Sequence, residues 1–217
     1  MTTKQLIISI LFRLKHASYS KRLILPVRNS TGEVVATLEL IVAGQVEDKE
    51  VVSLCAKWRK QYEWWFPKQF NVTIEGTKQW LKKGVIEVED RLLFLIVSNG
   101  VAIGHVGLYR FDYLAYSCEL DNILRGREGP VGVMTYATET MMAWAKKEFR
   151  LTDMSLRVFE DNTKAIALYE RIGFRRVLRI PLRKVVGNGE VVWEEDEKLK
   201  GANERSFILM TYSFGTV

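Results

Sequence analysis

The stretch that decides the fold runs from residue 156 to 174 and reads LRVFEDNTKAIALYERIGF. It starts as a β-strand, and a helix is expected after Asn162, whose side chain can cap backbone N–H groups of the first helical turn. Gly173 stands where helices commonly end in a left-handed residue. Between them, residues recur at helical spacing: Ala165, Ile166, Tyr169 and Ile172. The stretch therefore predicts a strand, a capped helix and a further strand.

A glycine-containing loop with two arginines, RGREGPVG at residues 125–132, precedes a second predicted helix at 131–149. Backbone N–H groups at a helix N-terminus bind phosphate, and glycine lets the backbone approach it closely. Pro130 has no N–H, which leaves Val131, Gly132 and Val133 as donors. By itself the loop also suits a tight strand-to-helix turn, but its place about 30 residues before Asn162 favours phosphate binding.

Together these stretches resemble the GNAT superfamily of acyl-CoA-dependent N-acetyltransferases. That superfamily combines a Gln/Arg-x-x-Gly-x-Gly/Ala loop with a later Asn, Ala, Tyr and Gly-Phe; Pro130 departs from the pattern. The resemblance covers roughly residues 35–212 and is strong over about 90–180. It implies an α/β (α+β) GNAT fold, with a mixed, mostly antiparallel central sheet flanked by helices. We expect an N-terminal β extension at 1–34 and the acetyltransferase domain at 35–217.

The resemblance implies acetyl-CoA as the cofactor, and it assigns Tyr169 as the general acid that protonates the leaving thiolate. A phenol with a pKa near 10 is protonated at neutral pH and can donate. A core tyrosine with a satisfied hydroxyl is the alternative. The expected cofactor-binding residues are Ile123, Leu124, Arg125, Arg127, Gly129, Val131, Gly132, Val133, Asn162 and Tyr169.

The general base is sought on the predicted strand at 117–124, where family members often carry an acid. Strand alternation places Glu119 and Asp121 on one face. Carboxylates in an otherwise apolar strand are costly unless they are used or paired. Glu119 is the first choice for the base and Asp121 the second. The alternatives are a pair of carboxylates that faces water, or one that orients an arginine.

Substrate-binding residues are expected in the aromatic cluster Trp64, Trp65 and Phe66 and at His105. Aromatic rings there can stack on a sugar or a base, or simply pack between helices. His105 lies on a strand next to that of Glu119. It is interpreted as a structural or substrate-contacting residue, with general base as the alternative.

The composition limits the class of protein. The 217 residues are 47% hydrophobic and carry a net charge of +6, with basic and acidic residues interspersed. No Lys/Arg run suits nucleic acid, whereas an anionic small molecule would explain the charge. Cys55 and Cys118 predict free thiols in a reducing, cytoplasmic location, and no metal site is expected. The apolar run at 6–12 is far shorter than the roughly 20 residues that span a bilayer, and is expected as a strand or short helix.

The remaining segments alternate between strands and helices. Asn99-Gly100 and Asn188-Gly189 predict tight hairpin turns, the second within a polar excursion at about 183–204. Helices are predicted from about residue 51 and at 73–83. The further predicted strands are 23–27, 34–42, 92–97, 101–111, 154–158, 174–181 and 207–212.

The predicted function is acetyl transfer from acetyl-CoA to a primary amine of a small molecule. The acceptor favoured is an amino sugar, nucleotide-linked or free, in surface-polysaccharide biosynthesis. Residues 65–67, 119–122 and the 183–204 excursion are similar in general character to bacterial amino-sugar N-acetyltransferases. The alternatives are a protein N-terminal, lysine or aminoglycoside-type acetyltransferase, and a non-catalytic acyl-CoA-binding module, which Pro130 would suit. A homodimer is left open.

Overall fold

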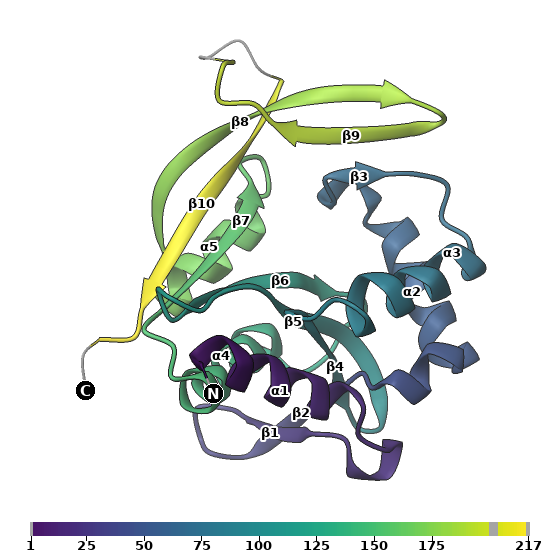
Figure 1. Ribbon diagram of the computed structural model, residues 1–217, viewed down its shortest axis with the longest axis vertical. Helices are drawn as coiled ribbons and strands as arrows, with labels where there is room; N and C mark the ends of the chain where they lie inside the picture. Colours follow the sequence, from purple (N-terminus) through teal and green to yellow (C-terminus); the bar gives the residue numbers. More distant parts are fainter. Residues whose placement is uncertain (1, 200–203, 216–217) are drawn as a thin grey trace.

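The computed structural model describes residues 2–199 and 204–215, in which ten strands form one twisted sheet (Figure 1). Neighbouring strands are antiparallel except for β6 and β7, which are parallel. This arrangement confirms the expected mixed, mostly antiparallel sheet. In spatial order the strands are β1 (Ile24–Arg28), β2 (Val34–Leu40), β4 (Leu92–Ser98), β5 (Val101–Asp112), β6 (Ser117–Arg125), β7 (Asp153–Phe159), β10 (Arg205–Ser213), β8 (Arg175–Gly187), β9 (Glu190–Glu195) and β3 (Lys68–Gln69).

Helices cover both faces of the sheet. They are α1 (Thr3–Lys15), α2 (Lys49–Gln61), α3 (Ile74–Gln79) with a π-helical continuation (Trp80–Ile86), α4 (Val133–Phe149) and α5 (Thr163–Ile172). Strand β4 explains the two layers, because its alternate residues enter different cores. Phe94 packs with α1, α4 and α5, whereas Leu95 packs with α2 and the π-helical turn. Short 3-10 turns lie at Tyr19–Lys21, Ala43–Glu47 and Glu63–Trp65.

The deciding stretch folds as its sequence predicts. The side chain of Asn162 accepts a hydrogen bond from the Ala165 N–H at 3.2 Å and so caps α5. Gly173 ends the helix at φ 111°, in the left-handed region, and its N–H bonds back to the last turn. Ile166 and Tyr169 form the buried face of α5. The cap and the glycine stop fix where β7 and β8 leave the helix.

The parallel strands β6 and β7 pair over a short length. Three residue pairs join them, the last being Glu119 with Ser155. Beyond this point the strands diverge, and their backbone groups there have no partner on the other strand. A wedge therefore opens in the middle of the sheet.

The N-terminal region differs from the expected β extension, because it begins with helix α1. Thr2 and Gln5 form a capping box, in which each side chain bonds the other residue's backbone N–H. Ile7 and Leu11, one turn apart, are buried in the main core. Strand β1 then pairs with β2 in the central sheet. The domain boundary between residues 34 and 35 stays a prediction.

The polar excursion at 183–204, of which residues 200–203 lie outside the described part of the chain, contains most of a long β-hairpin. Strand β8 extends to Gly187, and Asn188-Gly189 makes the predicted turn into β9. The tip of the hairpin lies beside β3, at the end of the molecule away from α1 (Figure 1). Strands β9 and β3 pair, and the Trp193 N–H donates to the Pro67 carbonyl at 2.7 Å. Since β3 follows α2, which packs on β4, the chain closes a ring around the wedge.

In the described part of the chain, no helix combines the length and apolar character needed to cross a membrane. Within the same residues, no group of His, Cys, Asp or Glu side chains is arranged to hold a metal ion.

Candidate active site

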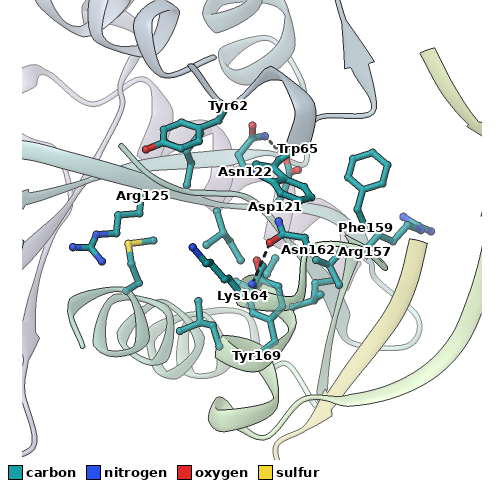
Figure 2. Close-up of a pocket in the computed structure, with 18 of the residues that line it drawn as sticks. Tyr62, Trp65, Asp121, Asn122, Arg125, Arg157, Phe159, Asn162, Lys164 and Tyr169 are labelled. Carbon is teal, nitrogen blue, oxygen red and sulfur yellow. Dashed lines mark hydrogen bonds between the residues drawn. The ribbon is translucent and has the colours of Figure 1, made fainter. Parts of the chain in front are cut away.

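A cleft of about 1200 Å³ occupies the wedge between β6 and β7 (Figure 2). Its walls come from those two strands, the start of α4, helix α5, and the aromatic residues near β3 and β9. In Figure 2, Asp121 and Asn122 lie on one side of the cleft, and Asn162, Lys164 and Tyr169 lie on the other. The structure thus brings the two halves predicted from separate stretches of sequence to one cavity.

Most of the predicted cofactor-binding residues line this cleft. They are Ile123, Leu124, Arg125, Gly129, Val131, Gly132, Val133, Asn162 and Tyr169. Arg127 does not line it; its carbonyl instead accepts a hydrogen bond from the Arg125 side chain at 3.2 Å. Arg125 is therefore the loop arginine placed to face a ligand in the cleft.

The backbone donors at the start of α4 differ in part from those expected. The Val133 N–H already donates to the Pro130 carbonyl at 3.1 Å, so the prediction that Val133 is a free donor for the cofactor is wrong. The first bond into the helix is from the Tyr136 N–H to the Gly132 carbonyl. Helix geometry therefore leaves the N–H groups of Met134 and Thr135 without an intrahelical acceptor. Both residues line the cleft, which makes this terminus suitable for an anionic group.

Two glycines hold the loop in the shape that exposes this helix terminus. Gly132 adopts φ 75° as the N-cap of α4, a conformation that other residues seldom adopt. A Cβ at Gly129 would lie 2.6 Å from Cδ1 of Ile103, so the loop packs tightly on β5. The orphan amides, the close-packed glycines and Arg125 together fit a pyrophosphate-bearing ligand such as acetyl-CoA.

Tyr169 lies on the cleft side of α5 and is 6% exposed. Among the residues that the structure describes, none forms a hydrogen bond with its hydroxyl group. Burial raises the pKa of Tyr169 above its usual value, so the phenol keeps its proton at neutral pH. The residue is a protonated donor that faces a ligand cavity.

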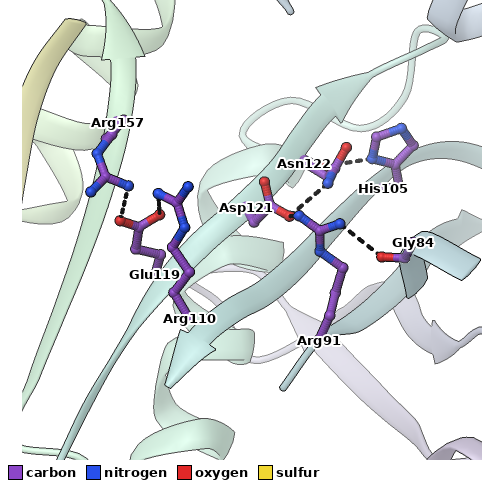
Figure 3. Close-up of polar contacts among 8 residues, drawn as sticks. All are labelled: Gly84, Arg91, His105, Arg110, Glu119, Asp121, Asn122 and Arg157. Carbon is purple, nitrogen blue, oxygen red and sulfur yellow. Dashed lines mark hydrogen bonds and ion pairs between the residues drawn. The ribbon is translucent and has the colours of Figure 1, made fainter. Parts of the chain in front are cut away.

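The two strand acids face the cleft as alternation predicted, and each is held by arginine (Figure 3). Glu119 forms ion pairs with Arg157 and, at 3.3 Å, with Arg110. Burial raises the pKa of Glu119 to about 7, although the charge of Arg110 opposes this rise. A carboxyl with a pKa near neutrality is well matched to act as a general base.

Asp121 is held through one oxygen, whereas both oxygens of Glu119 are paired with arginines. The Oδ2 atom of Asp121 accepts a hydrogen bond from Asn122 at 2.7 Å and pairs with Arg91 at 2.9 Å. Arg91 also donates to the Gly84 carbonyl at 2.7 Å and lies 3.7 Å from the ring centre of Tyr109. These bonds favour an orienting role for Asp121, which was one of the expected alternatives.

A β-bulge at Asn122 shapes this side of the site. Asn122 has φ 50°, and the pairing of β5 with β6 shifts register next to it, between His105 and Gly107. Nδ1 of His105 donates to the Asn122 carbonyl, which fixes the tautomer of the ring. His105 is 3% exposed and does not line the cleft. The structure therefore places it behind the bulge, where it supports the wall of the cleft.

The aromatic cluster divides between two roles. Trp65 and Phe66 line the cleft, but Trp64 does not. The Trp64 carbonyl accepts a hydrogen bond from Arg205 at 3.0 Å, and its ring centre lies 4.4 Å from that guanidinium. Arg205 also pairs with Asp161, so Trp64 helps to close the ring of chain around the cleft.

Sequence reasoning missed several cleft residues, among them Tyr62, Arg91, Arg110, Arg157 and Trp193. Arg157 left a signal, because it alternates with Leu156 and Val158 on β7 and must point away from their core. Trp193 left none, because its place depends on the long-range pairing of β9 with β3.

Acid pH is expected to destabilise the fold through His105. Burial lowers the pKa of His105 from 6.5 to about 4, so the native state resists protonation. Its stabilising contribution is therefore complete above pH 6.5 and is lost as the pH falls toward 4. The loss approaches ~3 kcal/mol. In His105→Asn the amide can still donate to Asn122 but does not titrate, and urea unfolding from pH 7.5 to 4 should show a flatter curve. Parallel curves for the two proteins would contradict this assignment.

Comparison with known families agrees with the fold and the site. The model of an acetyltransferase (GNAT) domain matches residues 40–175, which is more than half of the chain. The protein therefore belongs to the GNAT family of acetyltransferases. This membership confirms the expected fold, the acyl-CoA-dependent N-acetyltransferase class and acetyl-CoA as the cosubstrate. Roles of individual residues stay predictions. No curated protein sequence matches the chain significantly.

Solved structures share the fold at low sequence identity. A probable GNAT-family acetyltransferase from Chromobacterium violaceum has a TM-score of 0.63 and 14% identity, over 91% of this chain and 88% of its own. The Salmonella typhimurium acetyltransferase that modifies the N-terminal serine of ribosomal protein L7/L12 has a TM-score of 0.62 and 12% sequence identity. The match covers 89% of this chain and 100% of that protein's chain. The Vibrio cholerae spermidine N-acetyltransferase, solved with CoA and spermine, has a TM-score of 0.60 and 16% sequence identity. The match covers 82% of this chain and 95% of that protein's chain.

Proposed function

We propose that this protein transfers the acetyl group of acetyl-CoA to the primary amine of a small amino sugar, free or nucleotide-linked. The observation that carries the proposal is that one cleft contains both a cofactor-binding side with a proton donor and a carboxyl group suited to act as a base. The start of α4 and helix α5 supply the phosphate-binding amides and the phenol of Tyr169. Strand β6 supplies Glu119, a carboxyl whose pKa is near 7. Cys55 and Cys118, both free and buried, favour a reducing cytoplasmic location.

The proposed reaction uses one proton acceptor and one proton donor. Glu119 takes a proton from the acceptor ammonium, and the free amine attacks the thioester carbonyl carbon. The new C–N bond forms as the C–S bond breaks, and the phenol of Tyr169 gives its proton to the departing sulfur. The nitrogen then loses its second proton to solvent, from which the Tyr169 phenolate is reprotonated, so that a neutral amide and the CoA thiol remain. Asp121, fixed by Arg91 and Asn122, holds the acceptor side in place.

An amino sugar suits the acceptor end for two reasons. Trp65, Phe66 and Trp193 line the cleft near the acids, and aromatic faces stack on the apolar faces of sugar rings. The pairing of β3 with β9 encloses this end and disfavours an extended polypeptide. Acceptors differ among proteins of this fold, as the ribosomal-protein and spermidine enzymes illustrate, so the fold alone does not select one.

The test is an assay of acetyl transfer from acetyl-CoA to a panel of amines, in which the rate is measured from the release of free CoA thiol. The panel contains glucosamine, a nucleotide-linked amino sugar, spermidine and a peptide with a free N-terminus. We expect the highest kcat/KM with an amino sugar. Activity with spermidine or with the peptide, and none with the amino sugars, would contradict the proposed acceptor. Tight acetyl-CoA binding without turnover of any amine would favour the non-catalytic module.

A further inference from the structure

We infer that Arg110 is a specificity-determining residue that binds an anionic group, a phosphate or a carboxylate, on the acceptor amine. The inference rests on the proposed function and adds a charge requirement to the acceptor. It comes from comparing the three arginines at the acceptor end of the cleft, which are Arg91, Arg110 and Arg157.

Two of these arginines are committed to structure. Arg91 pairs with Asp121, donates to the Gly84 carbonyl and stacks on Tyr109, with 16% of its side chain exposed. Arg157 bridges Glu119 and Glu195, the latter at 3.0 Å, and is 26% exposed. Moving Arg91 would leave the partly buried carboxylate of Asp121 without its arginine, which is costly. Moving Arg157 would break two ion pairs at once.

Arg110 is held loosely in comparison (Figure 3). One Nη atom lies 3.3 Å from Glu119, a long ion pair, and 52% of the side chain is exposed. Glu119 keeps its contact with Arg157 whether or not Arg110 remains. Exposed ion pairs of this kind contribute little to the stability of a protein. A phosphate or carboxylate that engages two N–H groups of a guanidinium binds more strongly. Arg110 can therefore exchange Glu119 for a ligand anion at little cost.

The backbone of β5 is shaped to present Arg110 to the cleft. Successive residues of a strand point to opposite faces, yet Tyr109 and Arg110 both line the cleft. A register shift between Tyr109 and Asp112 and a φ of 52° at Arg110 explain this departure. A non-glycine residue in the left-handed region is strained, and such strain clusters at ligand-binding positions. The same bulge turns Phe111 into the main core, where its ring centre lies 5.0 Å from that of Phe149, and leaves Arg110 on the cleft side.

The test compares acceptors that share the amine and differ in charge: glucosamine, glucosamine 6-phosphate and 2-amino-2-deoxyglucuronic acid. For the wild type we expect kcat/KM at least about tenfold higher with one of the anionic acceptors. In Arg110→Gln, kcat/KM should fall at least about tenfold more with that anionic acceptor than with glucosamine, through a higher KM. Both proteins are compared above the pH at which their rates level off, because the charge of Arg110 lowers the pKa of Glu119. Arg110→Lys should restore part of the preference, because lysine keeps the charge but not the bidentate geometry.

The matched control is Arg176→Gln, an arginine that is 55% exposed, forms one ion pair with Glu170 and does not line the cleft. It should leave both the preference and the thermal midpoint unchanged. The phosphate and carboxylate arms separate the two sources of negative charge. Equal loss with charged and neutral acceptors in Arg110→Gln, or a wild type with no preference, would overturn the inference and leave the acetyltransferase function intact. A wild type that acetylates none of the panel's amines would instead overturn the proposed function, and the charge requirement with it.

Discussion

Replacing Glu119 with Gln is expected to lower kcat/KM by about 10²–10³-fold, within the range that general base catalysis contributes. Gln keeps the size of the side chain and a carbonyl oxygen that can accept from Arg157, but it cannot take a proton. Because burial already holds the pKa of Glu119 near 7, its neutral form is tolerated in the fold. The variant should therefore fold normally and bind acetyl-CoA as the wild type does. Steady-state kinetics and isothermal titration with acetyl-CoA measure the two properties.

The pH dependence tests the same assignment independently. A base acts when deprotonated, so wild-type kcat/KM should rise with pH and level off above an inflection near 7. Glu119→Gln should lose that inflection. Asp121→Asn is the matched control, because Asp121 lies two residues away on the same face and is bound through Oδ2 to Arg91 and Asn122. Its inflection should stay in place even if its rate falls. An unchanged pH–rate profile in Glu119→Gln would remove Glu119 as the base.

The parts of the site that the sequence predicted are those encoded by local patterns. The cap at Asn162, the helical spacing of Tyr169 and the glycine stop at Gly173 all lie within 12 residues. The shared face of Glu119 and Asp121 follows from strand alternation alone. These features depend on neighbours in the chain, so one sequence is enough to locate them.

The features that were missed or misplaced depend on distant parts of the chain or on departures from regular geometry. Trp193 reaches the cleft because β9 pairs with β3, about 120 residues earlier in the sequence. Arg110 reaches it through a bulge, which breaks the alternation used to assign faces. His105 was expected as a structural or substrate-contacting residue. The structure favours the structural role, because its partner is a backbone carbonyl across the bulge, which residue types do not reveal. At the N-terminus, the apolar run left a strand and a short helix both open, and the Thr2–Gln5 capping box is the local signal that favours the helix.

Replacing Tyr169 with Phe is expected to lower turnover at least about tenfold, a loss of ~1.4 kcal/mol in transition-state stabilisation. The phenol is the protonated group that α5 presents to the cleft, and Phe removes the proton that the departing thiolate needs. Among the described residues the hydroxyl has no hydrogen-bond partner, so its removal leaves no buried group unsatisfied. The ring keeps its edge contact with Phe174 at 6.2 Å. The free energy of unfolding and the affinity for acetyl-CoA should therefore change little.

The control for this variant is Tyr212→Phe, since the ring of Tyr212 also packs on Phe174, with ring centres 5.5 Å apart, and Tyr212 does not line the cleft. It should keep the wild-type rate. A more acidic thiol makes a better leaving group and needs less protonation, so the deficit of Tyr169→Phe should shrink with an acetyl thioester of a more acidic thiol that still binds. A structural role for the hydroxyl would lower both rates equally. Wild-type turnover in Tyr169→Phe would reject the general-acid assignment and leave Tyr169 as part of the core of α5.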